Sequence, residues 1–211
     1  MLERDQVAAS LEPIGRPAVS TPPERIPEFA RSSEAIRTAF LVAREAHEGP
    51  GHGDTKLTHP VAVAELVSRC GFDVDVVSAA MLHDTVEDTR LGIAEIRGRF
   101  GVEIASLVAD LTEDPRIAQY PARKADARGR AIVDPRAAAI YAADKLANVR
   151  RLLESGERID GERLDHYVKT LRFLCDVRPE LPFLAELSME MTTLFDREFG
   201  ADRADQITPF G

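Results

Sequence analysis

The sequence has no tryptophan, only two cysteines and no long apolar run. Cys70 and Cys175 are too few for a disulfide scaffold, and we expect both to be free, buried thiols. No window reaches the roughly 18 consecutive apolar residues of a membrane span. The first 30 residues carry Glu, Asp and Arg where a signal peptide would have its apolar region. These absences predict a cytoplasmic protein without a membrane partner.

Positive charge is also scarce, because 27 Lys and Arg face 36 Asp and Glu, which gives a net charge of −9. A negative field repels phosphate backbones, so we expect no nucleic-acid partner. Residues 121–151 reverse the balance, with eight basic side chains against three acidic ones. This segment suits a compact polyanion such as a phosphorylated small molecule. For any single basic residue, a solvated helix surface is the alternative.

The length of 211 residues and the hydrophobic content of 44% predict one domain with one core. No stretch shows the alternation of a strand, so we predict an all-α fold. Residues 1–31 contain five prolines and read as an irregular N-terminal arm, residues 32–200 as the helical domain, and residues 201–211 as a tail. The sequence leaves open whether the chain forms a homo-oligomer.

The strongest chemical signal lies in residues 81–89, where an apolar run leads into four polar side chains. At about 3.6 residues per turn, Glu87 follows His83 by one turn and Asp88 follows Asp84 by one turn. The four side chains would then form one patch. Three carboxylates beside an apolar wall require a cation, because an unpaired buried charge costs several kcal/mol. A solvated helix end is the alternative.

Two further residues complete a ligand set for a metal ion. His59 precedes Pro60, in the predicted first turn of a helix, and Asp144 lies inside a long helix predicted to start at Asp134. With His83 and Asp84 they offer two imidazoles and two carboxylates, which leave two positions open on a six-coordinate ion. This mixed set suits Mn²⁺, with Fe²⁺ or Zn²⁺ as alternatives. Such an ion can lower the pKa of a water and neutralise a phosphate oxygen, which is metal-assisted hydrolysis.

The order His…His-Asp…Asp resembles the HD-domain metal-dependent phosphohydrolases. Four blocks, at residues 46–49, 58–64, 80–89 and 143–148, are similar to the alarmone hydrolase half of the RelA/SpoT proteins. The small stand-alone hydrolases of the metazoan SpoT homologue type resemble the chain most. The resemblance implies an HD-domain helical bundle, Mn²⁺, and hydrolysis of the guanosine alarmone (p)ppGpp of the stringent response to GDP or GTP and pyrophosphate.

The resemblance also implies roles for individual residues. Glu87 and Asp88 match the pair that orients and deprotonates the attacking water. Arg163 and Tyr167, four residues apart, match a pair that lines the nucleotide site, and Lys124 matches a basic residue that faces the distal phosphates. A forked guanidinium contact to phosphate and a tyrosine ring against a sugar or base make these roles chemically reasonable.

Two residues near Asp144 are predicted to bind substrate as well. Asn148 is one turn beyond Asp144 and could donate to a ribose or phosphate oxygen, the alternative being a buried asparagine that satisfies backbone groups. Lys145, beside the predicted ligand, is counted among the phosphate-binding residues. His166 should face away from Tyr167, and we expect it on the surface.

The chain departs from its relatives in residues 48–57. The alarmone hydrolases usually carry a Gln-x-Arg-Lys type of segment and a Pro-Tyr pair here, and the Arg packs on the purine. In this chain the loop is about two residues shorter and lacks the tyrosine, and His52 stands nearest the Arg position. A histidine is neutral for much of the time near pH 7 and stacks less well than a guanidinium. We therefore predict an altered base preference, with His52 or Lys56 contacting the base.

Two other functions fit the same residues. The site could act on another phosphorylated nucleotide, such as NADPH or a phosphoadenosine, because HD domains differ mainly in the pocket. The chain could also be a non-catalytic nucleotide-binding regulatory domain. The presence of all six residues of the predicted metal and water site argues against the second alternative.

Overall fold

The computed structural model describes residues 25–47 and 55–200, apart from the side chains of residues 55 and 56. These residues form helices and turns without any strand, so the all-α prediction is confirmed. In chain order the helices are α1 (Glu28–Arg31), α2 (Glu34–His47), α3 (Thr55–Arg69), α4 (Val74–Leu82), α5 (Thr85–Asp88), α6 (Ile93–Phe100), α7 (Val102–Leu111), α8 (Tyr120–Ala131), α9 (Pro135–Ser155), α10 (Gly161–Val177) and α11 (Leu184–Phe199).

Helix α4 is the centre of the N-terminal half. It packs against α2, α3, α7 and α9, and every side chain from Val76 to Leu82 is buried. Asp73 begins this helix, as its side chain accepts hydrogen bonds from the main-chain N–H groups of Asp75 and Val76, both at 3.0 Å. Helix α4 thus delivers His83 and Asp84 directly behind an apolar segment.

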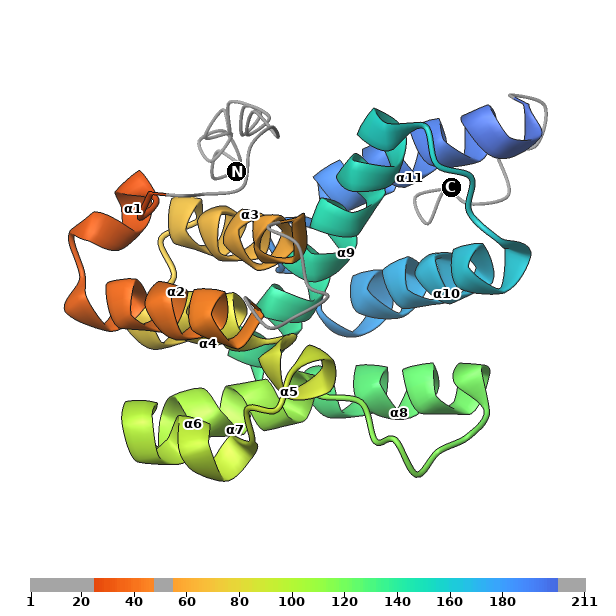
Figure 1. The fold of residues 1–211 in the computed structure, drawn as a ribbon. Helices are drawn as coiled ribbons and strands as arrows, with labels where there is room; N and C mark the ends of the chain where they lie inside the picture. The colour runs from red at the N-terminus through yellow and green to blue at the C-terminus, as the bar shows by residue number, and fades with distance from the viewer. Residues whose placement is uncertain (1–24, 48–54, 201–211) are drawn as a thin grey trace, which may run out of the picture.

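Helix α9 joins the two halves of the bundle, because it contacts α3, α4, α7, α8 and α11 (Figure 1). Its start is confirmed: the Asp134 side chain accepts from the Arg136 N–H at 2.8 Å, and Pro135 occupies the first turn. Buried alanines, including Ala139 and Ala143, line much of this helix. Because alanine is small, neighbouring helices can approach α9 closely from several sides.

Three predicted boundaries need correction. The arm was predicted to be irregular through residue 31, but residues 28–31 form α1, in which Ala30 is fully buried. Helix α3 begins at Thr55, so His59 lies inside it instead of at its start, since burial of Leu57 favours an additional turn before Pro60. The polar stretch after Leu82 is not one helix, because the chain bends at His83 and Asp84 before α5.

None of the helices in the described ranges is both long enough and apolar enough to cross a membrane. The predicted tail, residues 201–211, lies outside the described residues, as do the first 24 residues of the arm.

Candidate active site

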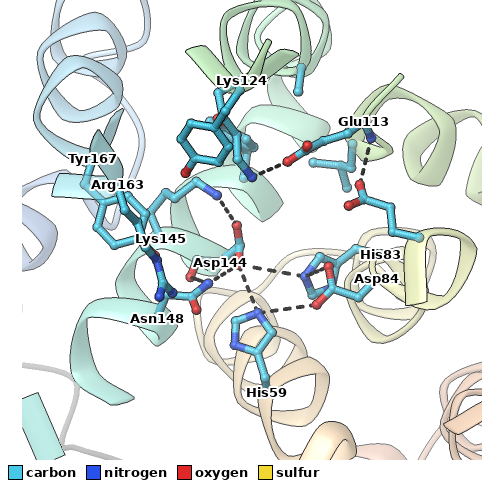
Figure 2. Close-up of a pocket in the computed structure, with 15 residues that line it drawn as sticks. His59, His83, Asp84, Glu113, Lys124, Asp144, Lys145, Asn148, Arg163 and Tyr167 are labelled. Atoms are coloured by element: carbon cyan, nitrogen blue, oxygen red, sulfur yellow. Dashed lines mark hydrogen bonds and ion pairs between the residues drawn. The ribbon is translucent and has the colours of Figure 1, made fainter. Parts of the chain in front are cut away.

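His59, His83 and Asp144 meet at one point, although they come from α3, the end of α4 and the middle of α9. Their ligand atoms all lie within 4.8 Å of one another. The Nε2 atom of His59 is 2.9 Å from Oδ1 of Asp144, and Nε2 of His83 is 3.9 Å from the same oxygen. Asp84 stands beside both rings, with Oδ1 3.1 Å from His83 Nε2 and Oδ2 3.7 Å from His59 Nε2. The four predicted ligands are therefore brought together (Figure 2).

The orientation of the His83 ring is set by its other nitrogen. Nδ1 lies 2.8 Å from the Ala80 carbonyl oxygen, and because a carbonyl only accepts, Nδ1 must donate. In the neutral ring Nε2 then carries a lone pair, and this buried atom has no hydrogen-bond partner among the described residues. A lone pair that faces carboxylate oxygens is favourable only when a cation lies between them. A backbone carbonyl that holds the remote N–H is the usual support of a metal-binding histidine.

The separations also fit a divalent ion. Ligand atoms about 2.1 Å from a six-coordinate ion lie about 3.0 Å apart when adjacent and about 4.2 Å apart when opposite. The measured pairs, from 2.9 to 3.9 Å, fall within these limits. Without an ion, burial lowers the pKa of His83, but the carboxylates of Asp84 and Asp144 outweigh burial and raise it to about 9. The site therefore favours positive charge, which a proton or a divalent cation can supply.

Asp144 is held by neighbours on its own helix. The Lys145 ammonium pairs with Oδ2, and the Asn148 amide donates to Oδ1 at 2.6 Å and to the Asp144 carbonyl at 3.1 Å. Burial raises the pKa of Asp144, yet Lys145, His59 and His83 together hold it well below its usual value. The carboxylate is therefore ionised and fixed. In this structure the amide group of Asn148 and the ammonium of Lys145 orient a ligand residue, whereas the sequence analysis predicted that both contact substrate.

Of the four residues of the predicted patch, His83, Asp84 and Glu87 line the cavity and Asp88 does not. The Asp88 N–H donates to the Asp84 carbonyl at 2.9 Å, so these two residues keep the predicted spacing of one helical turn. Glu87 lines the cavity and accepts a hydrogen bond from the Glu113 N–H at 2.7 Å. Partial desolvation, with the nearby carboxylates of Glu113 and Asp84, raises the pKa of Glu87. Asp88 is exposed and is not among the residues that line the cavity.

An open cavity of about 230 Å³ surrounds this cluster. Its polar lining consists of His59, His83, Asp84, Glu87, Glu113, Tyr120, Lys124, Tyr141, Asp144, Lys145, Asn148, Arg163 and Tyr167. Lys124 comes from α8, and Arg163 and Tyr167 come from α10, where the Arg163 Nε donates to the Tyr167 hydroxyl at 3.2 Å. Figure 2 shows Lys124 paired with Glu113 and Lys145 paired with Asp144 at the cavity. Together with Arg163 these cations suit a ligand with several phosphate oxygens.

Most of the basic segment 121–151 serves the fold instead of the cavity. Arg130 binds the carbonyls of Ala109 and Thr112, at 2.8 and 2.6 Å, and Arg136 pairs with Asp134 at 2.8 Å. Of this segment, only Lys124 and Lys145 bring a positive charge to the cavity. The alternative of a solvated helix surface does not describe them either, because all eight basic side chains of the segment are buried or half-buried.

His166 was predicted on the surface, and this was wrong. Only 5% of the residue is exposed, and its ring lies 6.2 Å from the Tyr120 ring and 5.7 Å from the Tyr167 ring, centre to centre. Burial, together with the nearby cations Lys145 and Lys124, lowers the pKa of His166 to about 3. The helical spacing on α10 was correct, but α8 covers this face of α10. A ring in this environment is neutral.

Two predicted substrate contacts cannot be located. His52 lies outside the described residues, and only the backbone of Lys56 is described, in the first turn of α3. Conversely, Glu113, Tyr120 and Tyr141 line the cavity although they were not predicted to do so. Glu113 stands in a Thr-Glu-Asp-Pro segment that marks a helix end, and its acidic side chain in a loop was the only available signal.

Comparison with known proteins agrees with this geometry. The family described as HD domain matches residues 39–169, which is more than half of the chain. The probable GTP pyrophosphokinase of Mycobacterium leprae is 33% identical over 150 residues, or 68% of this chain and 19% of that protein. The guanosine-3′,5′-bis(diphosphate) 3′-pyrophosphohydrolase of Aquifex aeolicus is 32% identical over 149 residues, 66% of this chain and 21% of its own. The chain thus spans about a fifth of the length of these curated relatives.

Two solved structures of similar size share the fold. One is a metazoan orthologue of SpoT, described as hydrolysing ppGpp and playing a role in starvation responses, with a TM-score of 0.60 and 27% identity over 80% of this chain and 97% of that one. The other is lmo0812 from Listeria monocytogenes, with a TM-score of 0.58 and 32% identity over 65% of this chain and 99% of that one. The family match over most of the described helices, with its two histidines and two aspartates in one cluster, shows that the chain belongs to the HD domain family.

Proposed function

We propose that this protein is a divalent-metal-dependent pyrophosphohydrolase that removes the 3′-diphosphate of (p)ppGpp and leaves GDP or GTP. One observation carries the reaction class: a buried histidine nitrogen without a donor faces two carboxylates inside a cavity that also holds Lys124, Lys145 and Arg163. The names of the Aquifex aeolicus relative and of the metazoan SpoT orthologue support the choice of substrate.

His59, His83, Asp84 and Asp144 would hold the ion. Their mixed nitrogen and oxygen donors favour Mn²⁺, and Fe²⁺ and Zn²⁺ are the alternatives. When bound, the ion supplies Lewis-acid chemistry, because it polarises a phosphate oxygen and lowers the pKa of a water. Lys145 and Asn148 keep Asp144 ionised and oriented for this purpose.

Glu87 is the base in this proposal. It takes a proton from the water that attacks phosphorus, and its raised pKa brings it closer to neutrality, where a general base works best. The Glu113 N–H fixes the carboxylate. Asp88, predicted as the second member of the pair, would need to approach the cavity from its exposed position to share this role.

The cations bind the substrate. We propose that Lys124 and Arg163 neutralise the phosphates and that the Tyr167 ring packs on the sugar or the base. The amide oxygen of Asn148 accepts from a ribose hydroxyl, because its nitrogen already donates to Asp144. His52 and Lys56 keep their predicted role at the base. A small phosphorylated nucleotide in the cytoplasm, with no nucleic-acid or membrane partner, is the expected ligand.

The test is an assay of purified protein, loaded with Mn²⁺, against a panel of 3′- and 2′-phosphorylated nucleotides, with products separated by chromatography. Release of pyrophosphate from ppGpp at the highest kcat/KM of the panel supports the proposal. Preferred release of phosphate from NADPH or from a phosphoadenosine would replace the substrate but keep the site. Tight binding of a nucleotide without turnover of any would instead favour the regulatory domain.

A further inference from the structure

Glu113 contacts two groups of the site with two different parts of the residue. It lies between α7 and α8, where its main-chain N–H donates to Glu87 Oε1 at 2.7 Å. Its carboxylate accepts from the Lys124 ammonium through Oε1 and from the Arg123 Nε through Oε2, the latter at 2.6 Å. One residue therefore links the proposed base to a cation of the cavity.

The two oxygens of this carboxylate have different surroundings. Arg123 also donates to the Ile117 carbonyl at 3.0 Å, so Oε2 is tied to the loop that leads into α8. Oε1 faces Lys124, which lines the cavity together with Glu113 (Figure 2). The Glu113 side chain is 17% exposed and the Lys124 side chain 23%. The loop is anchored on one side, and the ammonium is held on the other.

A lysine side chain needs such an anchor more than most. It has a flexible four-carbon stem, and holding it in one rotamer costs side-chain entropy. An ammonium has three N–H donors and a carboxylate oxygen takes one, so Lys124 can bind Glu113 and a phosphate together. Prior fixation of Lys124 would place this entropic cost in folding instead of in substrate binding.

We infer that Glu113 is a positioning residue, whose carboxylate aims Lys124 at the phosphates of the substrate and whose N–H aims Glu87 at the reacting water. This inference rests on the proposed function. The two parts of Glu113 have separable consequences. Loss of the side chain should weaken substrate binding through Lys124, whereas the N–H that holds Glu87 survives substitution to alanine, so turnover should persist.

The opposite role is also testable, because a carboxylate in the cavity could compete with phosphate for Lys124. The two roles predict changes in KM of opposite sign. If Glu113 competes, its removal should lower KM, and if it positions Lys124, its removal should raise KM. A purely structural role would reduce activity whether or not Lys124 is present.

The experiment is a double-mutant cycle of Glu113→Ala and Lys124→Met, with steady-state kinetics on ppGpp and calorimetric binding of inorganic pyrophosphate. We expect each single variant to raise KM about tenfold, which corresponds to about 1.4 kcal/mol, and to leave kcat within about threefold. The double variant should be no worse than Lys124→Met alone, because the effect of Glu113 passes through Lys124. The Kd of pyrophosphate should follow the same pattern.

The matched control is Asp114→Ala, which removes the adjacent carboxylate of the same loop. Asp114 pairs with Arg116 at 2.7 Å and does not line the cavity, so the KM of the Asp114→Ala variant should equal that of the wild type. Glu113→Gln keeps the shape of the side chain without its charge and should give an intermediate KM. This variant decides the question if Glu113→Ala does not fold.

A lower KM in Glu113→Ala, or additive losses in the double variant, would overturn the inference. A wild type that does not hydrolyse ppGpp would instead refute the proposed function, and the pyrophosphate arm would still decide the role of Glu113. Equal pyrophosphate affinity in the wild type and Glu113→Ala would then count against a positioning role of Glu113.

Discussion

Helix α9 carries two buried polar clusters that have very different surroundings. The Asp144 cluster, formed by Asp144, Lys145 and Asn148, faces the cavity and the two histidines. The Arg150 cluster, formed by Arg150, Glu186 and Glu190, joins α9 to α11. Arg150 is 8% exposed and Lys145 is 7% exposed, so burial alone does not distinguish the two clusters.

The environments of the two clusters distinguish them. In the Arg150 cluster one guanidinium meets two carboxylates, at 2.6 Å for Glu186 and 3.5 Å for Glu190, and none of the three lines the cavity around Asp144. In the Asp144 cluster the carboxylate of Asp144 already pairs with Lys145. It also lies 2.9 Å from a second basic group, His59, and near the Nε2 atom of His83, which has no hydrogen-bond partner among the described residues. The Nε and Nη1 atoms of Arg150 also have no hydrogen-bond partner among the described residues, so incomplete hydrogen bonding does not separate the two clusters. The difference is access, because the Asp144 cluster opens into the cavity and the Arg150 cluster is enclosed between two helices.

The largest effect should come from the open cluster. We expect Asp144→Ala to lose bound metal and to lower kcat/KM by about 10³-fold or more, because metal chemistry supplies several kcal/mol of transition-state stabilisation. Metal analysis of the purified variant and its kcat/KM should fall together. The companion Glu186→Gln, in the closed cluster, should retain its metal. A fully loaded and active Asp144→Ala would remove Asp144 from the ligand set.

Glu87→Gln tests metal binding and catalysis separately at the cavity beside the Asp144 cluster. The variant should bind metal normally, since Glu87 is not a proposed ligand, and should lose about 10²- to 10⁴-fold in kcat as a general base does. Asp88→Asn is the matched variant, and a much smaller loss is expected because Asp88 does not line the cavity. Comparable losses in both variants would restore the predicted acidic pair, and an unchanged kcat in Glu87→Gln would exclude it as the base.

Arg150→Ala should have the opposite signature. Removing the guanidinium takes away the cation that the carboxylates of Glu186 and Glu190 share between α9 and α11. Breaking a buried ion pair in this way lowers the free energy of unfolding by about 3–5 kcal/mol. Urea unfolding should show a lower midpoint, whereas the folded fraction should keep its metal and its kcat. If stability were unchanged and activity lost, the Arg150 cluster would have a role in function and not in joining α9 to α11.

Chelation of the metal should destabilise the fold moderately, because His59, His83 and Asp144 come from three separate helices. At a concentration 100 times its Kd, the ion contributes about 2.7 kcal/mol, so EDTA should lower Tm. The two clusters lie six residues apart, or about 9 Å along the helix axis. The effects of EDTA and of Arg150→Ala should therefore add within about 0.5 kcal/mol. A Tm that EDTA leaves unchanged would argue against stabilisation of the fold by an ion bound between these helices.

The smallest effect concerns the base. His52→Arg should increase the preference for guanosine over adenosine 3′-diphosphates by about 0.5–2 kcal/mol, because a guanidinium stacks on a purine better than an imidazole does. The ratio of kcat/KM for the two nucleotides measures this directly. Strong discrimination in the wild type, unchanged in His52→Arg, would show that this loop does not read the base.

The local signals of the sequence predicted the scaffold of the site well. The helix start at Asp134 was recognised because capping needs only the next few residues. The pairing of His59 with Asp144, 85 residues apart, followed from the resemblance and not from any local pattern.

The sequence by itself determined the all-α class and the main helices, because periodicity and caps are properties of short segments, and its resemblance to a known family pointed to the four clustered residues. The tertiary structure alone decided which polar residues face the cavity. It left Asp88 outside the cavity, brought Glu113 in between Glu87 and Lys124, and covered His166 with α8. Each of these outcomes depends on a neighbour from another part of the chain, which the periodicity of a single helix does not encode.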